Sequence, residues 1–173
     1  MSKNFNLREF QTRLSQQLQA AASRDTSGSR LGFSVGDSRW LVTLSDTEEV
    51  LPVPSLLKVP GARRWFRGLA NLRGNLYAVS DFADFMGLGV TPESSDCRLL
   101  IPHRDFGVNA ALLIGGTLGL RNIARFQPAD AVDSRPWVGQ HYRDDDETVW
   151  RDLDFGVLLG TPAFLMVEAT AAV

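Results

Sequence analysis

Short apolar segments separated by turn residues constrain the fold of this chain more than any other feature. Apolar residues alternate with small or polar ones in Leu31–Val35 and again in Trp40–Leu44, and Gly36-Asp37-Ser38 lies between the two segments. Such alternation is typical of a strand with one buried face, and a tight turn between two such segments predicts a β-hairpin.

The same pattern continues along the chain. Leu69–Leu72 and Leu76–Val79 flank Arg73-Gly74-Asn75, which predicts a second hairpin. Two prolines within Val50–Leu57 restrict any strand there to a sheet edge. Further strands are predicted at Arg98–Ile101, Val108–Ile114, Leu118–Ile123 and Val149–Leu153. Short strands at regular intervals, with only brief helices between them, favour small antiparallel barrels.

Brief helices are expected inside this β domain. Ser45 and Glu48 have capping-box spacing, which predicts a single helical turn before Val50. Asp81 is a typical N-cap residue, and it predicts a short helix over Phe82–Met86 that Gly87 closes.

An amphipathic helix is predicted ahead of the β domain, over residues 5–22. Its apolar residues recur at helical spacing, at Leu7, Phe10, Leu14 and Leu18. Residues 23–30 carry no apolar side chain and are typical of a linker. We therefore divide the chain into a helix and polar linker (1–30) and a folded domain (31–173). The pattern leaves open whether the helix packs on its own domain or on a partner.

The net charge of −2 hides a segregation of charge. Val50–Ser80 contains no acidic residue and five basic ones, which are Lys58, Arg63, Arg64, Arg67 and Arg73. Asp130–Asp154 carries eight acidic and three basic residues, a net of −5. A basic segment can steer nucleic acid or an acidic protein surface. A nucleic-acid-binding barrel that uses the Lys58–Arg73 patch is therefore the alternative function, although five charges are few for it.

Residues that could carry catalysis or hold a metal ion are scarce. The chain has two histidines, His103 and His141, and one cysteine, Cys97, which we expect to be an inert half-buried thiol. Asp144–Glu147 lacks the alternating ligands of a calcium loop, so we expect a solvated loop. Gly115–Gly119 misses the spacing of a dinucleotide-binding loop and favours a turn or bulge in a sheet. We therefore expect no enzyme, no cofactor and no metal site.

Membrane and secretion signals are also missing from the sequence. The longest apolar stretches, such as Ala110–Ile114, are far shorter than the roughly 20 residues of a membrane span. The polar-rich start of the chain contains no apolar signal-peptide core. We expect a cytoplasmic protein without direct membrane insertion.

The segment Gly68–Phe82 carries a resemblance to a known family. Its residues alone indicate that Gly68 and Gly74 allow tight backbone turns and that Asn71 bonds the backbone of a turn. Its sequence, GLANLRGNLYAVSDF, is similar to the CheW-like signature G-[ILV]-x-N-x-R-G-x-[ILV]-x-[PA]-V-x-D-[LF]. The preceding Glu49-Val50 and Val59-Pro60 also fit, and the resemblance covers about residues 31–159.

This resemblance implies both a fold and a function. The fold is mainly β, with two small SH3-like five-stranded barrels packed together, a short N-terminal α-helix and brief helices. Members of the family are adaptors, not enzymes, and they bridge a CheA-type histidine kinase and methyl-accepting chemoreceptors. The leading helix and linker resemble the variant that serves twitching motility by type IV pili, the PilI type.

The resemblance also implies an interaction site. The family's N-x-R-G arginine lies by the receptor and kinase surfaces and pairs with an upstream glutamate, and the matching residues are Arg73 and Glu49. We expect this ion pair to shape a docking groove. The predicted protein-interaction residues are Glu49, Leu56, Gly68, Asn71, Arg73 and Gly74. For Leu56 and its apolar neighbours, docking and ordinary core packing are equally compatible with the sequence.

Two positions depart from the family pattern. Ile114-Gly115-Gly116-Thr117 replaces the usual V-D-x-V motif, and Trp137-Val138-Gly139-Gln140 displaces the glycine of a later phenylalanine-x-x-glycine phrase. Both lie in the second half of the chain. We further expect the basic first half to meet the acidic second half head to tail, in a ring with the kinase's own CheW-like domain.

Overall fold

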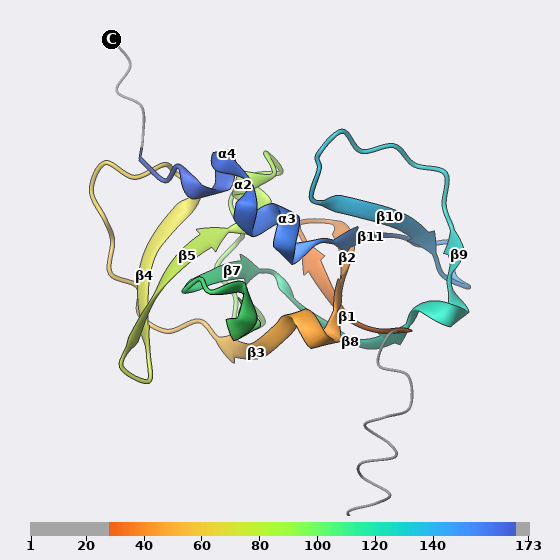
Figure 1. Cartoon of the computed structure of the whole chain (residues 1–173), viewed down its shortest axis with the longest axis horizontal. Coiled ribbons are helices and arrows are strands. Elements are labelled where there is room, and N and C mark those ends of the chain that lie inside the picture. Colours follow the sequence, from red (N-terminus) through yellow and green to blue (C-terminus); the bar gives the residue numbers. More distant parts are fainter. Residues whose placement is uncertain (1–27, 169–173) are drawn as a thin grey trace, which may run out of the picture.

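Two β-sheets packed against each other make up the domain, as seen in a computed structural model that describes residues 28–168 (Figure 1). The six-stranded sheet has the order β8 (Gly116–Asn122), β1 (Ser29–Val35), β2 (Ser38–Thr43), β11 (Val149–Leu153), β10 (Val138–Arg143) and β9 (Gln127–Pro128). The five-stranded sheet has the order β3 (Thr47–Pro52), β6 (Arg98–Pro102), β7 (Ala110–Ile114), β5 (Asn75–Asp81) and β4 (Phe66–Leu72).

The predicted fold class, mainly β with two packed halves, is confirmed, with two corrections. One half has six strands instead of five, because the two-residue β9 pairs with β10. The sheets are also not wholly antiparallel, since β11 pairs parallel to β2 and β5 pairs parallel to β7. The predicted N-terminal helix over residues 5–22 lies outside the described residues. Of the predicted linker, Ser29 and Arg30 already belong to β1.

Strands β6 and β7 contribute to two hydrophobic cores at once. Leu100, Leu112 and Ile114 face the core between the two sheets, where Phe33 and Trp40 are also fully buried. The alternate residues of the same strands face a second, smaller core inside the five-stranded half, which contains Ala70, Val79, Cys97, Leu99, Ile101, Ala111 and Leu113. Burial on both faces explains why these strands are continuous apolar runs.

Short helical segments connect and cover the sheets. The 3₁₀ turn η2 (Leu44–Asp46) begins one residue before the predicted turn, and Ser45 and Glu48 form no capping box, because Glu48 belongs to β3. The Asp81 carboxylate caps α2 (Phe82–Phe85) by accepting from the Asp84 N–H, as predicted. Further turns are η3 (Arg104–Phe106), η4 (Ile123–Arg125), α3 (Phe155–Gly160) and α4 (Pro162–Leu165).

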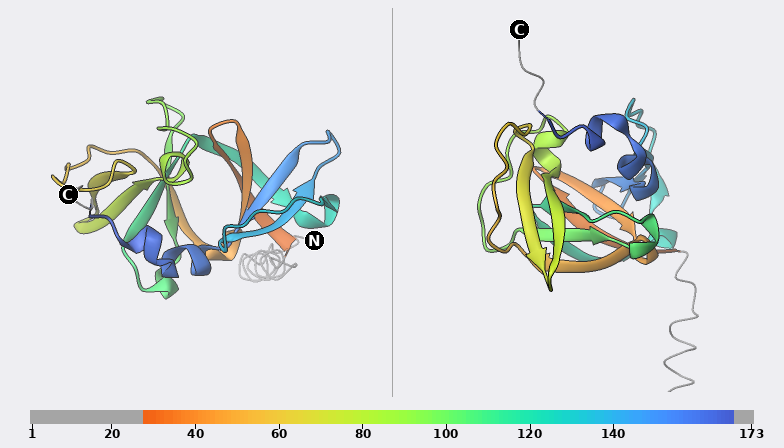
Figure 2. Two further views of the ribbon diagram at one scale, coloured as in Figure 1. Left: turned by 90° about the horizontal axis from the view of Figure 1, so that it is seen from above. Right: turned by 60° about the vertical axis from the view of Figure 1, so that its left-hand side comes forward.

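The chain passes back and forth between the two sheets. It leaves the six-stranded sheet through η2 and returns to it at Gly115, between β7 and β8. After β11, helices α3 and α4 run across the boundary between the sheets (Figures 1 and 2). The end of the described chain then reaches the five-stranded half, where the Arg63 N–H donates to the Val167 carbonyl (2.7 Å). The five-stranded sheet is therefore an insertion within the six-stranded one.

A cluster of aromatic side chains packs where α3 and α4 cross the boundary between the sheets. Phe85 of α2 packs against Trp65, Trp137 and Phe164, with ring centroids 5.2–5.3 Å away. Trp65 also stacks on Phe164 at 5.9 Å. These four residues come from segments of both sheet halves. Aromatic pairs of this geometry add roughly 0.5–1.5 kcal/mol each to stability, beyond the contribution of the area they bury. Within residues 28–168, no helix is long and apolar enough to span a membrane.

Candidate protein-interaction site

The β4–β5 hairpin presents Arg73 at its tip. Arg73 and Gly74 form a two-residue turn between the paired residues Leu72 and Asn75, and both turn residues have positive φ, 54° and 87°. Such turns match the twist of the flanking strands. The Gly74 N–H donates to Asn71 Oδ1 (2.9 Å), so Asn71 closes the turn as predicted. The sequence N-x-R-G thus fixes the place from which the Arg73 side chain extends.

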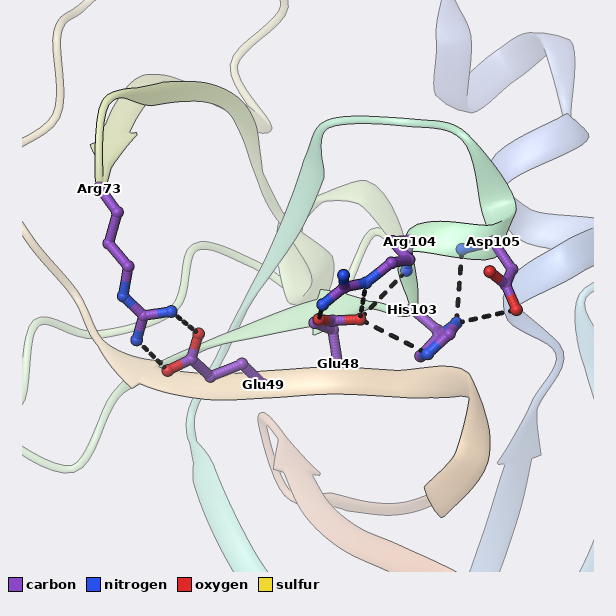
Figure 3. A network of polar contacts seen from close by, with 6 residues as sticks. All are labelled: Glu48, Glu49, Arg73, His103, Arg104 and Asp105. Atoms are coloured by element: carbon purple, nitrogen blue, oxygen red, sulfur yellow. Dashed lines mark hydrogen bonds and ion pairs between the residues drawn. The ribbon is translucent and has the colours of Figure 1, made fainter.

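A β-bulge in β3 brings two consecutive glutamates to the same side of the strand. Thr47 pairs with Pro102 and Glu49 pairs with Ile101, so Glu48 is an extra residue without its own partner in β6. Successive side chains of a regular strand point to opposite faces, and a bulge removes this alternation locally. Figure 3 shows Glu48 and Glu49 both projecting from β3 toward arginines of neighbouring segments.

The Glu49–Arg73 pair, which the family resemblance implies, is present and bidentate. Arg73 Nη1 donates to Glu49 Oε2 (3.0 Å), and Arg73 Nη2 donates to Glu49 Oε1 (2.6 Å). The Arg73 side chain is 76% exposed, and the Glu49 side chain is 32% exposed. An exposed pair contributes only about 0–1 kcal/mol to stability, so its main effect is to orient the guanidinium.

A second pair, which sequence reasoning missed, lies beside the first. Glu48 accepts hydrogen bonds from the Arg104 guanidinium and from the Arg104 backbone N–H. These bonds hold the pKa of Glu48 at about 2. His103 Nε2 also lies 3.5 Å from Glu48, and His103 Nδ1 lies 3.3 Å from Asp105 (Figure 3). Glu48 and Arg104 are 56 positions apart, and no local motif links them.

The two pairs border one groove of about 480 Å³. Its apolar lining comes from Leu72, Ile101, Pro102 and Val108, and Tyr77 and Asn109 add hydrogen-bonding groups. A groove lined by apolar residues, a tyrosine and two fixed arginines is suited to a protein segment, since arginine and aromatic residues are enriched where proteins bind each other.

Gly68 shapes the other edge of the hairpin. Its φ is +126°, and a Cβ there would overlap the carbonyl group of Leu57. The Leu57 and Leu69 backbones exchange two hydrogen bonds of 2.8 Å at this point. Gly68 is thus required for a close backbone approach, and this requirement gives a physical reason for the glycine that the resemblance singled out.

Leu56 and Leu57 differ in their surroundings. Leu57 is 66% exposed, whereas Leu56 is half-buried and packs against the second core together with Val53. Leu56 also lines a separate groove of about 350 Å³ near Cys97. A large part of the Leu56 side chain is therefore buried by packing against the second core.

The basic segment is largely engaged within the chain. Arg64 pairs with Asp84 and Arg67 with Asp81, while Arg63 donates to the Met166 carbonyl (2.8 Å). Together with the Glu49–Arg73 pair, these contacts neutralise or occupy most of the patch that a nucleic acid would need. The alternative of a nucleic-acid-binding barrel finds no support.

Cys97 and Asp144, which were considered as a nucleophile and as a cation ligand, both make contacts that hold the fold together. Cys97 is buried and lies 3.2 Å from the Pro92 carbonyl oxygen. Asp144 is held within its turn, because it accepts from the Trp150 indole N–H (2.8 Å) and from the Thr148 N–H (2.9 Å). The predicted solvated loop is present at Asp145, Asp146 and Glu147, which are exposed, while Asp144 is half-buried. Within residues 28–168, no group of three or more His, Cys, Asp or Glu side chains could hold a metal ion.

The glycine run departs from the family pattern for a visible reason. A Cβ on residue 115 would lie 2.9 Å from Ser34 Oγ, and the Gly115 N–H donates to the Ser34 carbonyl (3.0 Å). Opposite β1, Gly119 has φ +82° and the pairing skips Leu118, which is the predicted bulge. The run thus belongs to the crossing between sheets.

Comparison with known proteins shows which fold and family this architecture matches. The crystal structure of the scaffolding protein TtCheW from Thermoanaerobacter tengcongensis has the same fold, with a TM-score of 0.67 and 22% sequence identity over 79% of this chain and 90% of that chain. Residues 30–162 match the model of the CheW-like domain. The chain belongs to the CheW-like domain family, so the predicted family is confirmed.

One curated relative is closer in sequence. The chain is 31% identical to Protein PilI of Pseudomonas aeruginosa over 111 residues, which are 64% of this chain and 61% of that protein. The alignment therefore spans less than two thirds of the relative's length. This likeness agrees with the PilI type that the sequence indicated.

Proposed function

We propose that the protein is a non-enzymatic chemosensory adaptor that couples methyl-accepting chemoreceptors to a CheA-type histidine kinase and controls twitching motility by type IV pili. Membership in the CheW-like family supports the adaptor role, and the likeness to PilI supports the pilus pathway. In this proposal the protein works in the cytoplasm and joins membrane receptor arrays through its partners.

The observation that carries the proposal is the bidentate Glu49–Arg73 pair on an exposed hairpin tip. A guanidinium has five N–H donors, and Arg73 uses two of them on Glu49. The remaining donors belong to a side chain that is 76% exposed, so they are available to a partner's carboxylate or carbonyl oxygen. Glu49 fixes the direction in which they are offered.

The other predicted residues support this contact in different ways. Asn71 and Gly74 build the turn, and Gly68 allows the hairpin to lie close to the Leu57 backbone. Leu56 contributes the part of its side chain that lines the separate groove near Cys97. A scaffold with such contacts changes partner populations only by the difference in its affinities for their states.

Binding of the full-length protein to the kinase and to a receptor signalling fragment from the same organism tests the proposal. We expect Arg73→Ala to weaken at least one of these associations by about tenfold or more, as residues at the centre of an interface do, with unchanged unfolding behaviour. The charge-swapped variant Glu49→Arg/Arg73→Glu separates pairing from contact. The swap keeps the ion pair but moves the guanidinium from the hairpin tip to β3, so we expect binding to stay weak, and recovery of the wild-type affinity would contradict direct contact through Arg73.

Arg143→Ala is the matched control. It also removes an exposed arginine from an ion pair, with Glu147, but on the six-stranded sheet. We expect it to bind both partners like the wild type. If Arg73→Ala binds kinase and receptor at unchanged affinity, the assignment of this site is wrong.

A further inference from the structure

A groove of about 500 Å³ lies on the six-stranded half of the molecule, away from the hairpin that carries Arg73. Its residues come from β2, β8, η4 and the residue after it, the turn between β10 and β11, and β11 itself. In Figure 1 the β4–β5 hairpin is at the left of the molecule, and β9, which directly follows η4, is at the right. The groove and the proposed partner site therefore lie toward opposite ends of the domain.

One side of the groove is basic. Arg39, Arg121 and Arg125 line it, and all three are exposed. The Arg39 and Arg121 guanidinium groups lie over the Trp150 ring, 5.7 and 5.3 Å from its centroid. Among residues 28–168, no carboxylate forms an ion pair with any of the three. Stacking on an aromatic face fixes a guanidinium and leaves its N–H donors available.

The other side of the groove is acidic. Asp144 is held by the Trp150 indole and by backbone N–H groups, and this anchors the turn. Asp145 and Asp146 follow it, and both are exposed. In the described part of the chain, neither forms an ion pair. The same groove therefore offers two exposed aspartates, Asp145 and Asp146, on one side and two exposed arginines, Arg121 and Arg125, on the other, whereas Arg39 interacts electrostatically with Asp144.

We propose that this groove is the contact through which two copies of the chain associate about a two-fold axis. A two-fold interface places the same patch of both copies face to face, so it must be complementary to itself. A groove with one basic and one acidic side meets this condition, because rotation places the arginines of each copy against the aspartates of the other. Leu120 lines the groove and is 65% exposed, which supplies an apolar contact.

Sedimentation equilibrium of the full chain tests the proposal. We expect the wild type to form dimers at low ionic strength and the dimer dissociation constant to rise about tenfold or more with added salt, because salt screens exposed charge pairs. Two variants make the test specific. Arg121→Glu/Arg125→Glu replaces two of the groove's three arginines by glutamates and leaves Arg39, and Asp145→Arg/Asp146→Arg replaces two of its three aspartates by arginines.

Each variant alone should be monomeric, since like charges would then face each other. An equimolar mixture of the two should associate again, because the acidic groove of one fits the basic groove of the other. Circular dichroism verifies that both are folded, and the milder Arg121→Gln/Arg125→Gln variant replaces the first if it is not. Lys58→Glu, on the five-stranded half, is the charge control and should leave the dimer unchanged.

Two results would overturn the proposal: a wild type that stays monomeric at low salt, or reversal variants that dimerise as the wild type does. Failure of the mixture to associate while both variants are folded monomers would also contradict it. None of these outcomes bears on binding of kinase or receptor through Arg73, so the two assignments stand or fall separately.

Discussion

The backbone of Leu57 passes so close to Gly68 that a Cβ on residue 68 would overlap the Leu57 carbonyl oxygen and lie 2.9 Å from the carbonyl carbon. The two segments are joined here by an isolated bridge between Leu57 and Leu69. The entry of the chain into β4 thus depends on the absence of a side chain at one position.

Gly68→Ala should therefore destabilise the domain. The change adds both a backbone clash and strain at φ +126°, and we expect a loss of about 2–4 kcal/mol in the free energy of unfolding, measured with urea. Gly74→Ala is the control, because among the described residues no heavy atom lies within 4 Å of its added Cβ. It should cost only the strain of positive φ, about 1–2 kcal/mol. Equal losses in the two variants would refute the role of the close approach.

Leu56 and Leu57 provide a matched pair for the question that the sequence left open. Leu56→Asp places a carboxylate against the second core and should lower the free energy of unfolding by about 2 kcal/mol or more. Leu57→Asp, at a side chain that is 66% exposed, should change it by less than about 0.5 kcal/mol. Thermal unfolding measures both. An unchanged melting temperature for Leu56→Asp, with lost partner binding, would instead make Leu56 a docking residue.

Asp81 is fully buried, and its carboxylate is the centre of a polar network. It accepts from Thr91 Oγ1 (2.7 Å), the Thr91 N–H (2.9 Å) and Arg67 Nη1 (3.3 Å). Asp81→Ala leaves these donors without their acceptor, and we expect it to cost about 3–5 kcal/mol by chemical denaturation. Asp105→Ala removes a carboxylate that is 86% exposed and should be nearly neutral. A small loss for Asp81→Ala would mean that water replaces the carboxylate.

Acid unfolding should depend on Asp133. Hydrogen bonds from Arg135 hold the pKa of Asp133 at about 2, below its ordinary value of 3.8. Because the folded-state pKa is the lower one, the stabilisation is complete above about pH 4 and is lost as the pH falls toward 2. We expect Asp133→Asn to remove on the order of 1 kcal/mol of stability at neutral pH and to flatten the stability curve between pH 4 and 2. A variant with the wild-type slope in this window would contradict the prediction.

The sequence predicted elements whose signals are local. The turn residues between alternating segments located both hairpins, and Asp81 marked the start of α2. The pair of Glu49 with Arg73 was reached through a family resemblance, since 24 positions separate the two residues.

Features that depend on tertiary contacts were missed. Strand β10 contains Gly139 and Gln140, and its apolar and polar residues show little alternation. It therefore forms a strand because it pairs with β11. Helix α3 is only six residues long and is held by its cap at Asp154 and by the burial of Phe155 and Leu158 in the shared core. The capping-box spacing of Ser45 and Glu48 was misleading, because pairing of β3 with β6 takes Glu48 into a bulge. Local propensity is a weak guide wherever such contacts decide.

The insertion of one sheet within the other restricts how the domain can move. The described chain passes between the sheets at residues 44–46, at Gly115 and along α3 and α4. A change in the angle between the sheets must be absorbed at these three crossings, while each sheet keeps its own hydrogen bonds. The aromatic contacts of Phe85 with Trp137 and Phe164 brace the third crossing. The first of these crossings, residues 44–46, directly precedes the strand that carries Glu48 and Glu49, so a change of backbone angle there would also shift both glutamates.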